Sequence, residues 1–352
     1  MTTPKFLPVA LPLAITMGDP AGIGPEIIAK AFRDAPDLTA GCFAVGDVAT
    51  LRRAVTFISG PGRPGVPVAV IDSPVEAWDM PPRCIPVLQM AAVNGQPVPC
   101  GIVSGVAGAM AADCVTWAAR AALRGSIAAM VTAPLHKEAL SAAGVPFPGH
   151  TELLQAEAAM YLGKTVGEVP VRMMLANDEL RTVLVSIHMS LRDAIDAVTF
   201  DNVLQTLRIT HASVGSALQR APRIGVAGLN PHAGENGLFG REEIDVIAPA
   251  IAAARQSGLD VHGPFAPDTV FMRARSTPYQ AGVFDVVVAM YHDQGLIPVK
   301  YLGVEKGVNV TLGLPLVRTS PDHGTAFDIA GTGRADASSL MAAIRMARQL
   351  AR

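Results

Sequence analysis

Residues 284–295 read FDVVVAMYHDQG, a run of β-branched apolar residues that ends in a histidine-bearing turn. The pattern occurs twice more, in RTVLVSIHMS (181–190) and RIGVAGLNPHAGE (223–235). In an open α/β sheet, ligands bind in the crevice beyond the carboxyl ends of the strands. The three strand-end histidines are therefore expected to converge on one divalent cation: His188, His232 and His292. Any one of them alone is typical of a polar loop, but three protein ligands with an open fourth position are typical of a catalytic metal.

The rest of the chain alternates strand-like and helix-like segments at crossover spacing, which predicts an α/β fold with mainly parallel sheets. A length of 352 residues suits two α/β domains better than one. Half of the residues are hydrophobic and only 5% are aromatic, so small aliphatic side chains are expected to fill a large core. Residues 57–105 are rich in Pro and Gly, match no motif, and are expected to form edge strands and loops.

Composition excludes several classes of protein. The formal net charge is −2 without a basic tail, which argues against nucleic-acid binding. No apolar run approaches the ~20 residues of a membrane span. Lys5 and the apolar stretch 6–15 only faintly resemble a signal peptide, so a cytoplasmic location is expected. The four cysteines show no CxxC or zinc-finger spacing and are expected to be reduced, buried thiols.

Two short motifs suit an anion but are equally typical of ordinary local structure. The glycine cluster Gly18–Gly24 lies between a strand and a helix, and it matches neither the Rossmann nor the P-loop spacing. Its backbone N–H groups would face an anion at the helix N-terminus, or simply form a tight turn. Gly149-His150-Thr151-Glu152 precedes another helix, where Thr151 would bind a phosphate or merely cap the helix.

Polar residues also cluster near the C-terminus. Lys300, Asn309 and Arg318 follow the last histidine turn, and cationic side chains in a nearly neutral protein suit an anionic substrate. The loop DHGTAFDIAG (322–331) is similar to the loop that holds the adenosine part of NAD in isocitrate and isopropylmalate dehydrogenases. Those enzymes bind the dinucleotide without a Rossmann motif.

Taken together, the chain resembles the 4-hydroxythreonine-4-phosphate dehydrogenase family of pyridoxal 5′-phosphate biosynthesis. The resemblance covers nearly the whole chain and rests on long motifs in a fixed order: GDPAGIGPE (18–26), TAPLHK (132–137), GHTELL (149–154), LNPHAGE (229–235), GPFAPDTVF (263–271), AMYHDQG (289–295) and GVNVTLGLPLVRTSPDHGTAFDIAG (307–331). It implies an isocitrate/isopropylmalate dehydrogenase-like fold of two α/β domains with an active-site cleft between them. One domain would comprise residues 1–149 and 300–352 and carry the dinucleotide loop. The other would comprise residues 150–299 and carry the metal ligands and the dimer contacts.

The resemblance also implies roles for individual residues. His188, His232 and His292 match the metal ligands, and the family is a homodimer whose site lies at the subunit interface with ligands from both subunits. The positions that contact the phosphorylated substrate are matched by His150, Thr151, Lys300, Asn309 and Arg318. Acid–base roles are expected of Lys300, Asp293 and Asp268. NAD or NADP contacts are expected of His323, Gly324, Thr325 and Asp328.

The implied reaction is oxidation of 4-phosphooxy-L-threonine at C3 to 2-amino-3-oxo-4-phosphooxybutanoate, which loses CO₂ to give 3-amino-2-oxopropyl phosphate. The metal would acidify the C3 hydroxyl, and Asp293 or Lys300 would take its proton. Three imidazoles suit Zn²⁺, although Mg²⁺, Mn²⁺ or Co²⁺ could function. The alternative is a paralogous dehydrogenase of 4-phospho-D-threonate or 4-phospho-D-erythronate. A relative acting on a terephthalate dihydrodiol fits the GHT and GVNVTLGLP segments less well.

Two other classes of protein fit the sequence less well. A periplasmic-type binding protein for small anions would also have two α/β domains, but it needs a signal peptide and no strand-end histidines. A metal-dependent phosphatase or hydrolase would need no dinucleotide loop.

Overall fold

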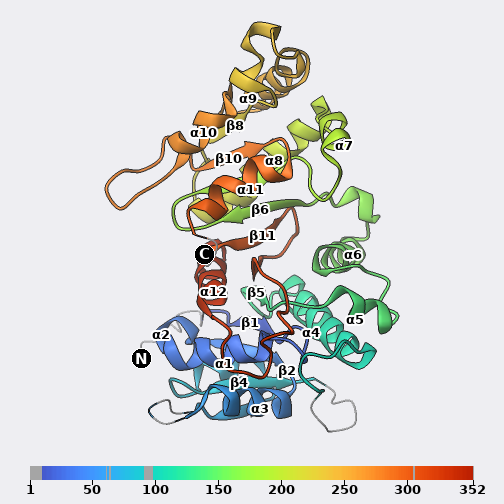
Figure 1. Cartoon of the computed structure of the whole chain (residues 1–352), viewed down its shortest axis with the longest axis vertical. Coiled ribbons are helices and arrows are strands. Elements are labelled where there is room, and N and C mark those ends of the chain that lie inside the picture. Colours follow the sequence, from blue (N-terminus) through green and yellow to red (C-terminus); the bar gives the residue numbers. More distant parts are fainter. Residues whose placement is uncertain (1–9, 61, 63–64, 91–97, 304–305, 352) are drawn as a thin grey trace, which may run out of the picture. The chain divides into compact units, whose positions relative to one another are not determined.

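The computed structural model describes residues 10–60, 62, 65–90, 98–303 and 306–351 (Figure 1). The chain divides into two compact units: unit 1 is Met1–Thr165 with Pro315–Ala351, and unit 2 is Val166–Leu314. These limits fall later in the chain than the expected boundaries at 149/150 and 299/300. The reason is local: helix α6 (His150–Leu162) packs against α4 (Gly105–Leu123) of unit 1, and strand β11 (Val308–Leu312) pairs with β6 (Arg172–Ala176) of unit 2.

Unit 1 is built on parallel strands in the order β3-β4-β2-β1-β5-β12. Besides α6, its elements are β1 (Leu13–Thr16), α1 (Gly24–Asp34), α2 (Pro36–Thr39), β2 (Cys42–Gly46), α3 (Val48–Ile58), β3 (Val68–Ile71), η1 (Pro74–Trp78), β4 (Ile85–Gln89), α4 (Gly105–Leu123), β5 (Ala129–Thr132), α5 (Lys137–Ala142), β12 (Arg318–Pro321) and α12 (Ser338–Leu350). The central strands β1, β2 and β5 are buried along their whole length, which explains their unbroken apolar sequences. Helix α4 packs on these three strands, and α12 packs on β5 and β12.

Residues 57–105 give unit 1 its edge. Strand β3 lies at the end of the sheet and pairs only with β4, as the Pro- and Gly-rich sequence suggested. Residues 61, 63–64 and 91–97 of this stretch lie outside the described residues.

Unit 2 has the strand order β11-β6-β7-β10-β8-β9. Besides β11, its elements are η2 (Val166–Glu168), β6 (Arg172–Ala176), β7 (Arg181–Leu184), α7 (Leu191–Asp196), α8 (Phe200–Leu218), β8 (Ile224–Ala227), η3 (Pro231–Gly237), η4 (Glu243–Ile247), α9 (Ala248–Gln256), β9 (Val261–Phe265), α10 (Pro267–Ala274), β10 (Val286–Ala289) and α11 (His292–Tyr301). β7, β10, β8 and β9 are parallel, but β6 runs antiparallel to both β7 and β11. The sheet is therefore mixed rather than purely parallel.

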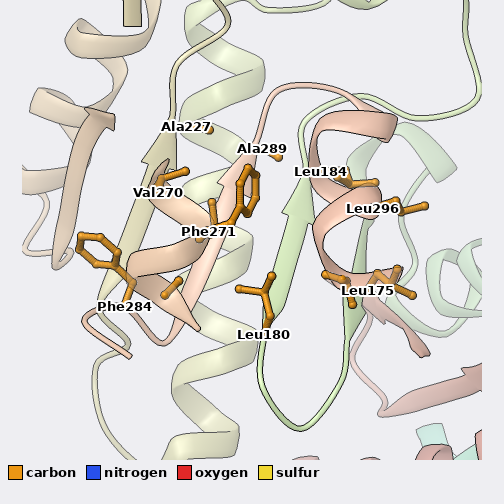
Figure 2. Close-up of a cluster of buried hydrophobic side chains, with 12 residues drawn as sticks. Leu175, Leu180, Leu184, Ala227, Val270, Phe271, Phe284, Ala289 and Leu296 are labelled. Carbon is orange, nitrogen blue, oxygen red and sulfur yellow. The ribbon is translucent and has the colours of Figure 1, made fainter. Parts of the chain in front are cut away.

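A hydrophobic cluster beneath α10 and α11 anchors unit 2 (Figure 2). Leu296 and Val299 of α11 and Val270 and Phe271 of α10 pack on the apolar side chains of the neighbouring strands, including Leu184. Full burial of one such side chain stabilises the fold by roughly 1.5–3 kcal/mol. This packing fixes the start of α11, which carries one of the candidate metal ligands.

No helix within the described ranges is both long and apolar enough to cross a membrane.

Candidate active site

His188 and His292 lie side by side in unit 2. They follow β7 and β10, which pair in parallel, so their carboxyl ends adjoin. The two ring centroids are 5.7 Å apart, with an angle of 44° between the planes. Two imidazoles that share a tetrahedral metal at about 2.1 Å would have centroids about 5.3 Å apart. The pair therefore fits a common divalent cation.

A cavity of about 260 Å³ adjoins this pair. Its polar lining includes both imidazoles and Asp293, and its apolar lining includes Ile187 and Met189. A mostly apolar cavity with a few convergent polar groups is typical of a small-molecule site.

Asp293 contacts its neighbour in sequence. An oxygen of its carboxylate lies 2.7 Å from Nδ1 of His292. A proton on Nδ1 then bonds to the carboxylate and leaves the Nε2 lone pair for a metal, an arrangement common among metal-bound histidines. The structure thus places Asp293 as an orienting partner of His292.

His232 occupies an unusual turn after β8. Five consecutive residues have left-handed backbone, with φ of 52° at His232, 53° at Ala233, 79° at Gly234, 42° at Glu235 and 55° at Asn236. Only glycine adopts this conformation without cost, and other residues pay roughly 1–2 kcal/mol each. The His232 side chain is 66% exposed and lies 3.9 Å from the Glu235 carboxylate.

The three histidines do not form one cluster in a single chain. Among the described residues, no three side chains of His, Cys, Asp or Glu are close enough to hold a metal ion together. The structure brings His188 and His292 together and leaves His232 apart from them.

Glu243 holds the strained turn. Its side chain is 3% exposed, and Oε1 accepts hydrogen bonds from the backbone N–H groups of Leu229 and Asn230, both at 2.7 Å. Oε2 accepts a third bond from Nδ2 of Asn230 at 2.9 Å. No motif reveals this role, because Glu243 acts on backbone groups well before it in the chain. The only hint in the sequence is a carboxylate just after a polar turn.

The remaining unit 2 candidates are spread over several elements. Asp268 is exposed in the first turn of α10, and Lys300 is partly buried in the last turn of α11. Asn309 lies on β11, where it pairs with Leu175 of β6.

Arg318 forms a buried cationic site in unit 1. It begins β12 beside β5, is 4% exposed, and donates from Nε (3.0 Å) and Nη2 (2.8 Å) to Oγ1 of Thr132. Burial lowers the pKa of Arg318 to about 10, and the charge of Glu152 opposes this shift. The guanidinium remains protonated at neutral pH and is held in place by Thr132.

His150 completes this site at the N-terminus of α6. Burial, together with the charge of Arg318, lowers the pKa of His150 well below its usual value. Nε2 of His150 is buried and has no hydrogen-bond partner among the described residues. Thr151 follows in the first turn, and no side chain caps this helix end. A fixed cation, an unpaired imidazole nitrogen and a helix N-terminus together suit a phosphate group.

The loop 322–331 packs against the glycine cluster. The carbonyl of Thr325 accepts the N–H of Ile23 at 3.0 Å, and a Cβ at Gly22 would meet Thr325 at 3.0 Å. Thr325 is buried, whereas three other candidates in the loop are exposed: His323, Gly324 and Asp328. Thr325 therefore holds the loop in place, and the exposed residues are accessible to a cofactor.

Sequence reasoning missed two residues beside this loop. His136 stacks on Phe327 with centroids 4.7 Å apart, and its Nδ1 is buried. Asp19 is fully buried; burial raises its pKa, while the N–H of Ala21 and the charge of His136 oppose the shift. Within the described part of the chain, neither Nδ1 of His136 nor Oδ2 of Asp19 has a hydrogen-bond partner. His136 lies in the motif TAPLHK and Asp19 in the motif GDPAGIGPE. Only the burial of their unpaired atoms, which the structure shows, distinguishes them from their neighbours.

Comparison with known proteins gives a consistent result. The family model described as pyridoxal phosphate biosynthetic protein PdxA matches residues 39–347. A 4-hydroxythreonine-4-phosphate dehydrogenase from Beijerinckia indica is 52% identical over 340 residues, which cover 96% of this chain and 95% of that protein. A D-threonate 4-phosphate dehydrogenase from Salmonella typhimurium is 46% identical over 340 residues, covering 96% and 98%. The crystal structure of a 4-hydroxythreonine-4-phosphate dehydrogenase from Klebsiella pneumoniae superposes with a TM-score of 0.86 at 42% identity, covering 97% and 100%.

Proposed function

Since the chain belongs to the PdxA family of pyridoxal phosphate biosynthetic proteins, we propose that it is a cytoplasmic dehydrogenase that oxidises 4-phosphooxy-L-threonine at C3, using NAD or NADP and a divalent metal. The β-keto acid formed then loses CO₂ to give 3-amino-2-oxopropyl phosphate. The observation that carries the proposal is the His188–His292 pair, which is spaced for one cation on the wall of a cavity.

The donor set suits the metal that this chemistry needs. His188 and His292 supply two imidazoles, and Zn²⁺ prefers such ligands, although Mg²⁺, Mn²⁺ or Co²⁺ would also serve. Because His232 lies apart from the pair, the third imidazole is assigned across a homodimer interface, where each site combines ligands of both subunits. A bound cation would supply polarisation of the C3 oxygen, and a bound NAD or NADP would supply the acceptor for the hydride.

The protein's own groups bind and orient the substrate. Arg318, His150 and Thr151 are proposed to hold the phosphate, with Arg318 already fixed by Thr132. Asn309 is a further proposed substrate contact. Asp293 keeps His292 in the tautomer that presents Nε2. This leaves Lys300 as the preferred base for the C3 hydroxyl proton, while Asp268 is a second candidate. The dinucleotide is assigned to the loop at His323, Gly324, Thr325 and Asp328, so unit 1 would carry the cofactor and unit 2 the metal and the dimer contacts.

A second substrate deserves equal testing, because relatives of similar identity are named D-threonate 4-phosphate dehydrogenases. The two substrates differ at C2, where an amino group replaces a hydroxyl.

The deciding experiment compares both substrates on one metal-loaded preparation, with reduction of NAD and of NADP followed by absorbance. A higher kcat/KM for 4-phosphooxy-L-threonine supports the proposal, whereas preference for 4-phospho-D-threonate assigns the protein to the alternative. His188→Ala should lower turnover by at least about 100-fold and weaken metal binding. The matched control is His262→Ala, because His262 is an exposed histidine of the same unit that pairs with Asp260 away from the cavity residues. Full activity of His188→Ala without bound metal would refute the metal centre.

A further inference from the structure

The backbone ladder of unit 2 ends just before the candidate metal ligands. The β10–β8 pairing stops at Val288 and Val226, and the β10–β7 pairing stops at Ala289 and Leu184. One further backbone bond joins β7 and β10, from the N–H of Val185 to the carbonyl of Ala289 at 2.9 Å. Past that bond, the described hydrogen bonds that join these three segments involve side chains.

The side chain of Gln294 joins the end of β10 to the end of β8 by two hydrogen bonds. Its Oε1 accepts the N–H of Met290 at 2.7 Å, and its Nε2 donates to the carbonyl of Gly228 at 2.8 Å. Met290 precedes His292 by two residues, and Gly228 begins the turn that leads to His232. The side-chain amide thus acts as one more rung of the sheet, with an acceptor on one side and a donor on the other.

The same link continues at both ends. Toward β7, the Ser186 hydroxyl donates to the carbonyl of Met290 at 2.9 Å, two residues before His188. Side chains therefore bond to both backbone polar groups of Met290, its N–H and its carbonyl. Beyond Gly228, the next two N–H groups bond to the carboxylate of Glu243. One hydrogen-bonded path therefore joins all three histidine turns, and Gln294 is its central member.

We propose that Gln294 is a positioning residue, whose amide sets the turn of His292 against the turn of His232. This rests on the proposed metal-dependent function and adds a residue to it. In the proposed homodimer, each subunit contributes His292 to one metal site and His232 to the other. The distance between the segments that carry these two histidines must then be fixed for both sites to form. Partners that orient metal ligands typically change metal affinity 10–100-fold, roughly, when they are removed.

Two substitutions break this link in different ways. Gln294→Met keeps the length of the side chain but removes donor and acceptor. Gln294→Glu keeps an acceptor for Met290 but places a carboxylate oxygen against the carbonyl of Gly228. Gln256→Met is the control, since Gln256 is exposed at the end of α9.

The test measures the Zn²⁺ affinity of the full-length protein by competition with a chelator, and the visible spectrum of the Co²⁺-loaded protein. The thermal unfolding midpoint of the metal-free protein is recorded beside them. We expect both Gln294 variants to bind Zn²⁺ roughly 10–100-fold more weakly. Their Co²⁺ spectra should be altered while the metal-free midpoint stays within a few degrees, and Gln256→Met should match the wild type.

Wild-type Zn²⁺ affinity in Gln294→Met would overturn the inference while leaving the proposed function intact. So would a loss of affinity that only parallels a lower metal-free midpoint, because that would indicate a general structural role. Should Gln294→Met fail to fold, Gln294→Glu decides between the same two outcomes. A wild-type protein that binds neither metal would overturn the metal centre and this inference together.

Discussion

Replacing Ala233 by glycine should stabilise the protein, which is the reverse of the usual effect of this substitution. Ala233 has a φ of 53° and lies between His232 and Gly234 in the left-handed turn after β8. A residue with a Cβ is strained there, and glycine is not.

The magnitude follows from two opposing terms. Left-handed backbone costs a non-glycine residue roughly 1–2 kcal/mol. Glycine loses roughly 0.5–1 kcal/mol more conformational entropy than alanine on folding. The difference leaves Ala233→Gly more stable by about 0.5–1 kcal/mol. Ala252→Gly is the control: Ala252 is exposed within helix α9, where the same change should cost about 1 kcal/mol.

The assay is guanidinium unfolding of the two variants and the wild type without metal, with midpoint and slope fitted for each. The two substitutions should shift the midpoint in opposite directions and differ by about 1.5–2 kcal/mol in unfolding free energy. A loss of stability in Ala233→Gly similar to that in Ala252→Gly would refute the reasoning, because it would show that the turn stores no strain.

Three further outcomes are expected. Burial alone would raise the pKa of Asp285. Hydrogen bonds from Arg220 and Arg223 outweigh burial and hold this pKa well below its usual value. Stability from this carboxylate is therefore present above about pH 4 and lost as the pH falls below it, so urea unfolding of the wild type and Asp285→Asn should converge in acid. Arg318→Lys should raise KM for the phosphorylated substrate about 10-fold or more, with a smaller change in kcat, because lysine cannot reproduce the fixed fork; an unchanged KM in steady-state kinetics would contradict the assignment. In native protein, a thiol reagent should modify Cys100 first, because the other three thiols are buried, and burial raises the pKa of Cys114 to about 12; rapid loss of all four thiols would contradict this.

The sequence predicted the parallel core well because its strands are buried on both faces. β1, β2, β5, β8 and β10 have short apolar sequences bounded by polar turns, which is the strand-like pattern that the alternation along the chain predicts. The positions of the three histidines after β7, β8 and β10 could be predicted for the same reason, since a buried strand that stops at a polar residue marks its own carboxyl end.

The antiparallel hairpin of β6 and β7 was missed although a signal existed. Asn177 starts the short connection, and its side-chain oxygen accepts the N–H groups of Glu179 and Leu180. Such a turn is too short for the crossover that parallel strands need, so β6 runs antiparallel within a sheet that is otherwise mainly parallel, as predicted.

Helix α11 was missed because local and tertiary preferences conflict. Gly295 and Pro298 within residues 292–301 favour a turn, and Pro298 lies inside the helix. Burial of Leu296 and Val299 in the unit 2 core outweighs that preference. No motif marks Gln294 or Glu243 either, because their partners include backbone groups, whose positions depend on the fold rather than on residue type.

The burial of Arg318 has a consequence for the proposed binding of an anionic substrate. A cation that is 4% exposed in a protein of net charge −2 projects little field into solvent. Its attraction acts on an anion only after that anion has entered the buried site. Dissolved ions screen charges weakly in such a site. On the proposed assignment, Arg318 would contribute to the residence time of the phosphate rather than to the rate of encounter, and capture should depend little on ionic strength.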